Sequence, residues 1–376
     1  MANNSSLGNA KQAKKDEFYT QYEDIQKEIN AYLEFDKNTF RGKTVLLPCD
    51  DPEWSNFTRY FAGHFEELGL KKLISTSYAV NSKKDVYKVG EYYTTLFEMN
   101  SPQYDEDITM SRGKIFTLTG DKNNSGKVDV DDLEWQYLDG DGDFRSAEVR
   151  ALRDEADIIV TNPPFSLFRE FLAWILEADK KFLIIGNQNA ITYKEVFPLI
   201  KANKLWMGES IHSGDRKFYV PDNYPLDAAT CGEENGRKFI RVKGVRWFTN
   251  LDHGRRHKPL ELMTMADNLR YNNHGGKLAY PKYDNYDAIE VSYTDAIPSD
   301  YTGVMGVPIT FLDKYCPEQF EIVGIAKRGA GDPALKSRVY TKEDYNNYSD
   351  LNAGPVIIQN NGIPKNTYPR ILIKQR

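Results

Sequence analysis

The residues best suited to chemistry form one short segment, Thr161-Asn162-Pro163-Pro164-Phe165, which directly follows the apolar run 157–160. That run predicts a buried strand, and ligands of open α/β sheets bind at the carboxyl ends of such strands. Two successive prolines fix the backbone and remove two N–H donors, so the segment presents carbonyl oxygens. The side chain of Asn162 adds a further carbonyl. The segment is therefore rich in acceptors and lies at a ligand-binding edge.

Such an arrangement suits an exocyclic amino group, which offers two N–H donors to two fixed acceptors. Phe165 adds an aromatic face on which a base can stack. Accepting both hydrogen bonds polarises the nitrogen and prepares its lone pair to attack a methyl group. No acid–base residue is needed, because the amine can lose its proton after the transfer. A strand-ending turn without chemistry is the alternative interpretation, and the position before an aromatic-rich helix weighs against it.

Alternating strands and helices surround this segment and predict a doubly wound α/β domain. The predicted helices cover 15–35, about 57–68, 167–176 and about 193–201, and the predicted strands cover 44–47, 72–76, 114–118, 157–161, 181–185 and 244–248, the last of the series. The first strand, helix and strand form a βαβ unit, for which parallel pairing is expected. Residues beyond 260 are rich in Tyr, Asn, Gly and Pro and predict a second, irregular region.

Length and composition set the broad class. A chain of 376 residues suits two domains, and 40% hydrophobic with 28% charged residues excludes wholesale disorder. No apolar run approaches the ~18 residues of a membrane span, and the N-terminus shows no apolar signal region. The three cysteines are scattered, which suits a reducing compartment. A cytoplasmic location is therefore expected. The net charge of -6 argues mildly against nucleic acid. Residues 242–376, however, hold 18 Lys and Arg against 15 Asp and Glu, or +3, which leaves -9 on the first 241 residues.

Asn-Pro-Pro-Phe is the catalytic tetrapeptide of amino-group DNA methyltransferases that use S-adenosylmethionine, and this chain resembles the EcoRI-type adenine-specific members. The similar segments are 45–57, 142–146, 156–168, 180–186, 189–193, 303–308, 311–313 and 370–373. The resemblance implies methylation of adenine N6 in DNA. It also implies an α/β fold with a doubly wound, mostly parallel, seven-stranded, Rossmann-like sheet. A catalytic domain would span 1–255, and an irregular target-recognition, DNA-binding region would span 256–376.

The resemblance assigns roles to individual residues. Asn162, Pro163 and Phe165 would hold and stack the target adenine, with Pro164 shaping the turn. The residues expected to contact the cofactor are Phe18, Tyr19 and Thr20 at its methionine end, Asp50 at its amino group, and Asp143 and Phe144 at its adenine. The glycine-rich loop usual after the first strand is replaced here by the segment 50–57, and no acidic residue ends the second strand. The ribose-binding residue is therefore not identified.

Double-stranded DNA is the expected partner, and no membrane contact is expected. The cations expected to contact its phosphates are Arg255, Arg256 and Lys258 in one cluster and Lys327 and Arg328 further on, with an exposed loop as the equal alternative for each. A cognate restriction endonuclease would share the recognition site, without a stable complex being implied. The histidines show no metal-ligand spacing.

Some patterns point elsewhere. Residues 121–132 fit an EF-hand loop, but position 12 is Asp132 rather than Glu and a strand precedes the loop, so a solvated acidic hairpin turn is the preferred interpretation over calcium binding. Cys49 is expected to be a small buried residue and His64 a structural one. Two other functions stay open: a methyltransferase acting on an RNA base or a protein glutamine, and a non-catalytic DNA- or calcium-binding relative.

Overall fold

The chain divides into two compact units. The computed structural model describes residues 20–49, 55–79, 101–212, 215–220, 231–234, 236–328 and 338–376. Unit 1 comprises Met1–Gln188 and Gly208–Asp252, and unit 2 comprises Asn189–Met207 and His253–Arg376. No helix among the described residues has the length and apolar character needed to cross a membrane.

A large mixed sheet forms the centre of the fold. Its strands, in sheet order, are β4 (Glu134–Tyr137), β3 (Lys114–Leu118), β2 (Lys72–Ser77), β1 (Thr44–Leu47), β5 (Ile158–Thr161), β6 (Lys181–Asn187), β11 (Val245–Thr249) and β7 (Trp206–Met207). The four strands β2-β1-β5-β6 run parallel, whereas β3, β4 and β11 pair antiparallel. The α/β class and the parallel first βαβ unit are confirmed. The described sheet has eight strands rather than the expected seven, and its flanks are antiparallel, in part because β3 and β4 form a hairpin.

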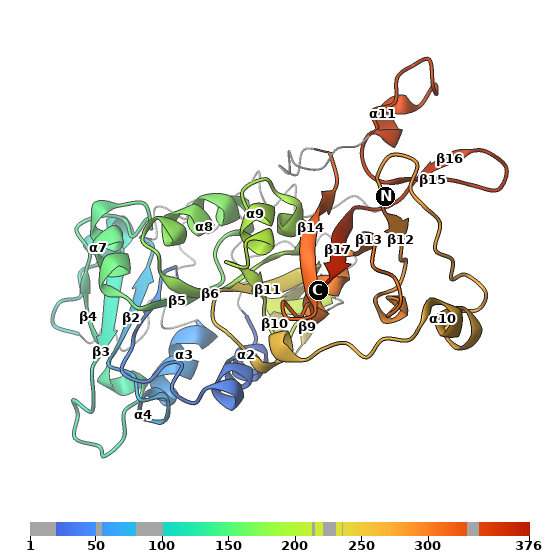
Figure 1. The fold of residues 1–376 in the computed structure, drawn as a ribbon. Helices are drawn as coiled ribbons and strands as arrows, with labels where there is room; N and C mark the ends of the chain where they lie inside the picture. The colour runs from blue at the N-terminus through green and yellow to red at the C-terminus, as the bar shows by residue number, and fades with distance from the viewer. Residues whose placement is uncertain are drawn as a thin grey trace. The chain divides into compact units, whose positions relative to one another are not determined.

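Helices cover both faces of this sheet in unit 1. They are α2 (Tyr22–Phe35), α3 (Asn56–Gly63), α4 (Phe65–Leu68), α6 (Glu106–Ser111), α7 (Ala147–Glu155) and α8 (Phe168–Glu177), with 3-10 turns η2 (Val130–Asp132) and η3 (Phe165–Leu167). Figure 1 shows α2 and α3 on one side of the central strands and α7 and α8 on the other. The doubly wound arrangement is therefore confirmed, and it buries the parallel strands on both faces.

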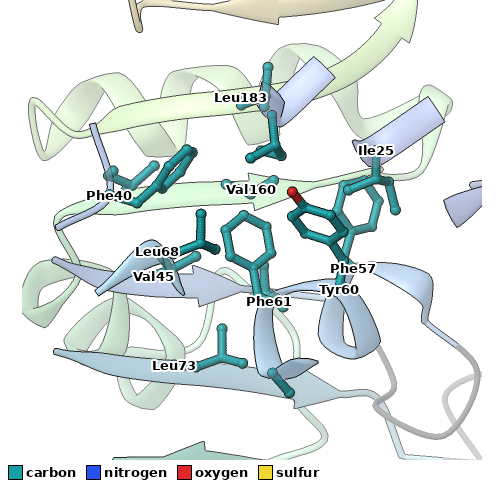
Figure 2. Packing of buried hydrophobic residues seen from close by; sticks show 14 of the residues in the cluster. Ile25, Phe40, Val45, Phe57, Tyr60, Phe61, Leu68, Leu73, Val160 and Leu183 are labelled. Atoms are coloured by element: carbon teal, nitrogen blue, oxygen red, sulfur yellow. The ribbon is translucent and has the colours of Figure 1, made fainter. Parts of the chain in front are cut away.

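The core beneath α2 and α3 fixes the position of the central strands. Figure 2 shows Phe57 and Phe61 of α3 facing Val45 of β1, Val160 of β5 and Leu183 of β6. All of these side chains are at most 2% exposed. Burial of one such side chain stabilises the fold by about 1.5–3 kcal/mol. The strands that carry the candidate residues are therefore packed in the core against α3.

Several predicted helices have different bounds in the structure, among them the one predicted over about 193–201, which begins at Phe197. The helix predicted over 15–35 begins at Tyr22 among the described residues, with Gln21 as its N-cap. The helix predicted over 57–68 is broken at His64, whose backbone leaves the helical region at φ -113° and ψ 17°. The ring of His64 hydrogen-bonds the carbonyl of Tyr60 at 2.9 Å, which fits the structural role expected for it. Gly69, at φ +62°, then ends α4.

A small antiparallel sheet in unit 1 was not predicted. It contains β8 (Asp215–Tyr219), β10 (Arg237–Lys243) and β9 (Cys231–Glu234), in that order. Only every second residue of β10 is apolar and buried, as in Ile240 and Val242, so the strand lacks the continuous apolar run of the central strands. Alternation of this kind is typical of a sheet that is packed on one face and solvated on the other.

Unit 2 is more regular than expected. One sheet has the order β12 (Ile289–Glu290), β13 (Met305–Pro308), β17 (Arg370–Gln375), β14 (Phe320–Ala326), and a hairpin pairs β15 (Val356–Ile358) with β16 (Pro364–Asn366). Its helical elements are η4 (Gln188–Thr192), α9 (Phe197–Lys201), η5 (Gly254–His257), α10 (Met265–Tyr271), η6 (Thr294–Ala296), η7 (Ile309–Lys314) and α11 (Tyr348–Leu351). The strand predicted at 244–248 is confirmed as β11, the last strand of the central sheet in chain order, whereas the region after 260 holds more paired strands than expected. Short strands that pair across long separations, such as β13 with β17, carry little local pattern.

Candidate active site at the carboxyl edge of the central sheet

The segment 161–165 lies where β5 ends beside β1. Thr161 is fully buried, and its hydroxyl donates to the carbonyl of Pro48 at 2.7 Å. β1 and β5 are parallel neighbours, with Val45 opposite Ile158, so the residues that follow the two strands lie at the same edge of the sheet. The hydrogen bond therefore ties the candidate segment to the end of the first strand, as expected for a ligand-binding edge.

The two prolines have different surroundings along the turn. Both are buried, and the carbonyl of Pro164 accepts the N–H of Leu167 at 2.9 Å as η3 begins. The carbonyl of Pro164 is thus part of the turn itself, which agrees with the shaping role expected for that residue. Phe165 is partly buried and packs against the core beneath α3. The acceptors proposed for a substrate are then Asn162 and the carbonyl of Pro163.

Thr20 holds the carboxamide of Asn162. Its side chain is 4% exposed, and its hydroxyl oxygen accepts a hydrogen bond from Nδ2 of Asn162 at 3.3 Å. The carbonyl of Thr20 in turn accepts from Nδ2 of Asn56 at 2.7 Å. Because Nδ2 points to Thr20, the amide oxygen of Asn162 is the carboxamide atom that points away from Thr20. Thr20 was expected to contact the cofactor, and the structure brings it to the catalytic candidate.

Asn56 is a site residue that the sequence reasoning missed. It is the first residue of α3, and the preceding Ser55 caps the helix by accepting the N–H of Phe57 at 3.1 Å. A Ser-Asn pair that opens the helix after the first strand is a sequence signal for a polar group at this edge. Phe18, Tyr19 and Asp50 were expected nearby, but they lie outside the described residues.

Asp143 is held as a carboxylate at the same edge. Its two oxygens accept from Nε of Arg145 at 2.9 Å and from Nη2 at 2.6 Å. This bidentate pairing with Arg145 lowers the pKa of the Asp143 carboxyl below its ordinary value. An ionised acceptor of this kind suits a ligand with N–H or O–H donors.

The ring of Phe144 packs inside unit 1. It is 1% exposed and meets Phe171 and Trp174 of α8 edge-on, with ring centroids 5.1 and 5.6 Å away. A ring enclosed in this way stabilises the loop before α7. The contact expected between Phe144 and the cofactor stays a prediction.

Cys49 and Tyr78 lie at the ends of β1 and β2. Cys49 is partly exposed rather than buried as expected, and it adopts φ +73°, a conformation that favours glycine. Its thiol contacts the hydroxyl of Tyr78 at 3.7 Å. Burial, followed by the nearby Cys49 and Asp143, raises the pKa of Tyr78 well above its ordinary value. Tyr78 follows the second strand, at the end of which the sequence has no acidic residue. Sequence reasoning gave Tyr78 no role.

The loop 139–146 approaches β2 closely. Gly142 has φ +86°, and a Cβ at this position would lie 2.3 Å from the carbonyl oxygen of Ser77. The carboxylate of Glu148 accepts the N–H of Asp139 at 3.0 Å, and Ser146 caps α7. Backbone contacts and caps thus fix the loop that carries Asp143.

The candidate phosphate contacts in unit 2 differ in exposure. Arg256 is 6% exposed, with its guanidinium 3.6 Å over the ring of Trp206 and its Nη2 donating to Asn203 at 2.6 Å. Lys327 is half-buried, donates to Thr192 at 2.6 Å, and has its pKa lowered by burial. Both groups hydrogen-bond within unit 2, and their contact with phosphates stays a prediction.

The other cations of that set lie at the surface of unit 2. Lys258 and Arg328 are exposed, and Arg255 is partly exposed. Exposure leaves their charged groups accessible to a phosphate, so these three keep the expected role as a proposal.

The loop resembling an EF-hand connects β3 and β4, which confirms the hairpin. The Asp132 carboxylate accepts three backbone N–H groups, from Lys122, Asn123 and Asp129. Asp121 accepts those of Ser125 and Gly126. The loop's carboxylates therefore cap its own backbone.

Comparison with known proteins gives consistent matches over most of the chain. A family model described as adenine-specific methyltransferase EcoRI matches residues 6–376. The Type II methyltransferase M.EcoRI of Escherichia coli is 46% identical over 331 residues, which cover 87% of this chain and 90% of that protein. The Type II methyltransferase M.MpnI of Mycoplasma pneumoniae is 34% identical over 371 residues, covering 98% and 97%. No solved structure matches the chain.

Proposed function

Because the chain belongs to the EcoRI family of adenine-specific methyltransferases, which are site-specific DNA methyltransferases, we propose that it transfers the methyl group of S-adenosylmethionine to N6 of adenine in DNA. Family membership favours this function over the alternatives of an RNA or protein substrate and of a non-catalytic binding protein. The observation that carries the proposal is the position of Asn162, at the carboxyl end of β5 with its amide held by Thr20.

The target adenine has to leave the duplex, since its amino group is unreachable while the base is stacked. The amide oxygen of Asn162 and the carbonyl of Pro163 accept the two N–H groups of the flipped base. Phe165 supplies the stacking face. With both N–H groups held in this way, the lone pair of N6 would be directed at the methyl group that S-adenosylmethionine supplies, and the amine would lose a proton after the transfer. Catalysis comes mainly from positioning.

S-adenosylmethionine, when bound, supplies an electrophilic methyl group, and the carboxyl edge of β1 and β2 fits such a ligand. The fit rests on the ionised carboxylate of Asp143 and on the close backbone approach at Gly142. Thr20, Asp143 and Phe144 would hold the cofactor together with Phe18, Tyr19 and Asp50, which lie outside the described residues.

Recognition of the duplex is assigned to unit 2 and the region 256–376. Lys258, Arg328 and Arg255 would contact phosphates, which position the protein without reading sequence. The catalytic domain would span 1–255.

A labelled-methyl assay tests this function. Purified protein is incubated with mixed-sequence duplex and labelled S-adenosylmethionine, and Asn162→Ala is compared with Asn38→Ala, an exposed turn residue. Loss of one positioned polar contact in an active site lowers turnover on the order of 10²-fold. We expect that loss for Asn162→Ala with cofactor binding retained, and wild-type turnover for Asn38→Ala. Equal turnover of the two variants would exclude Asn162 as the catalytic acceptor.

A further inference from the structure

The outer face of the small sheet in unit 1 combines cations with aromatic rings. Phe218, Ile240 and Val242 turn inward and belong to the core of unit 1. Because side chains alternate along a strand, the intervening residues face outward. The outward residues are Lys217 and Tyr219 of β8 and Arg237, Phe239, Arg241 and Lys243 of β10, all at least partly exposed. We call these six residues the β8–β10 face.

The rings of this face hold its cations. In the antiparallel register Phe239 lies opposite Tyr219, and Arg241 lies opposite Lys217. The guanidinium of Arg237 lies 4.0 Å over the ring of Tyr219, and that of Arg241 lies 5.8 Å from the ring of Phe239. The ammonium of Lys217 lies 5.3 Å from the Phe239 ring. Cations stacked on rings lose less side-chain freedom when they meet an anion.

The charge of this face is opposite in sign to that of the chain. The face carries the four cations Lys217, Arg237, Arg241 and Lys243, whereas the whole chain carries -6. Among the described outward residues of the three strands, Glu234 pairs with Lys217, and Asp215 lies opposite Lys243. Glu234 also lies opposite Arg237 in the register of β9 and β10, but its ion pair is with Lys217, and no ion pair of Arg237 or Arg241 occurs within the described part of the chain. The face therefore offers two arginines to an anionic partner.

The β8–β10 face is joined directly to the catalytic sheet. One glycine, Gly244 at φ +71°, separates β10 from β11. β11 pairs with β6, which is the parallel neighbour of β5. A ligand held on this face is thus positioned by the same unit that carries Asn162.

We infer that the β8–β10 face binds phosphates of the substrate DNA through Arg237 and Arg241, as a second contact apart from the region 256–376. Arg237 and Arg241 lie four residues apart on one strand, about 13 Å, so the two guanidinium groups form a row that suits a polymer with repeated negative charges. Guanidinium groups bind phosphate in bidentate geometry, and such contacts are indifferent to sequence. The inference rests on the proposed function, since it takes duplex DNA as the substrate.

Binding of a mixed-sequence duplex to Arg237→Gln/Arg241→Gln, measured by anisotropy over a salt series, tests the inference. Loss of two phosphate contacts should lower the slope of log K against log salt by about 1.8 and weaken binding roughly 10- to 100-fold near 0.1 M salt. The matched control, Lys37→Gln/Lys43→Gln, removes two exposed cations from the opposite, amino-terminal side of β1. It should bind like the wild type.

A second variant changes binding in the opposite direction. Glu234→Gln releases Lys217 from its ion pair and should tighten binding a few-fold, which a merely destabilised protein would not do. Steady-state assays should show a raised KM for DNA with unchanged kcat for the arginine variant. Equal DNA affinities and salt slopes for the arginine variant and its control would overturn the inference. A face that binds a protein instead of DNA would also give this result. Wild-type protein that neither binds nor methylates the duplex would instead refute the proposed function.

Discussion

Thr20 provides a sharp test of how the site is organised, because two roles are available to it. Its hydroxyl accepts the hydrogen bond from Nδ2 of Asn162 at 3.3 Å, and the resemblance to the family assigns it a contact with the cofactor. Thr20→Val removes the hydroxyl and keeps the shape of the side chain. The backbone carbonyl that accepts from Asn56 at 2.7 Å remains, so the segment stays in place. The variant therefore isolates one contact.

The expected loss follows from the nature of that contact. A net intramolecular hydrogen bond contributes about 0.5–1.5 kcal/mol. If that energy serves to orient Asn162 in the transition state, kcat falls about 2- to 13-fold, at one decade for each 1.36 kcal/mol. The KM for cofactor should change much less. Thr20→Ser retains a hydroxyl and should recover most of the rate, and Thr117→Val, a half-buried threonine of β3, should not affect it.

The assay is steady-state methyl transfer to saturating duplex with varied cofactor, combined with a direct measurement of cofactor affinity. A raised KM for cofactor with unchanged kcat would assign Thr20 to the cofactor and contradict the positioning role. Unchanged values of both parameters would contradict both roles.

Two further predictions concern packing and charge within unit 1. Gly208→Ala should lower the free energy of unfolding in urea by at least ~2 kcal/mol. The new Cβ would lie 2.1 Å from Oε1 of buried Glu28 and 2.5 Å from Cβ of Trp247. An unchanged urea midpoint would refute this packing. The folded-state pKa of Asp143 lies below that of an unfolded carboxyl, about 3.9, so its contribution to stability is present above that pH and is lost as pH falls through the lowered value. Arg145→Gln should thus cost about 1 kcal/mol or less at pH 7 and progressively less in acid, and a cost independent of pH would contradict the ion pair.

The parallel centre of the fold was predictable because its signals are local. β1 and β3 have the predicted bounds, since short apolar runs flanked by turn residues mark strands that are buried on both faces. The small sheet and the sheet of unit 2 were missed because their strands alternate or pair across long separations, as Met305 does with Ile373. Such pairings have no signature within a window of ten residues.

The site was predictable in part for a similar reason. Asn162 follows its strand directly, so its position at the edge follows from topology. Contact between Thr20 and Asn162 joins residues 142 positions apart and required the tertiary structure. The burial of Arg256 over Trp206 was equally hidden, since an arginine in a basic cluster has the same sequence pattern whether it faces solvent or a ring.

The most direct test of the central claim is the chemical identity of the methylated product. Duplex DNA is incubated with the protein and S-adenosylmethionine labelled in its methyl group, then digested to nucleosides and separated. The account predicts that the label elutes as N6-methyl-2′-deoxyadenosine, and that Asn162→Ala lowers its yield on the order of 10²-fold. Label in a cytosine nucleoside, or no label in DNA from protein that binds the cofactor, would contradict the account.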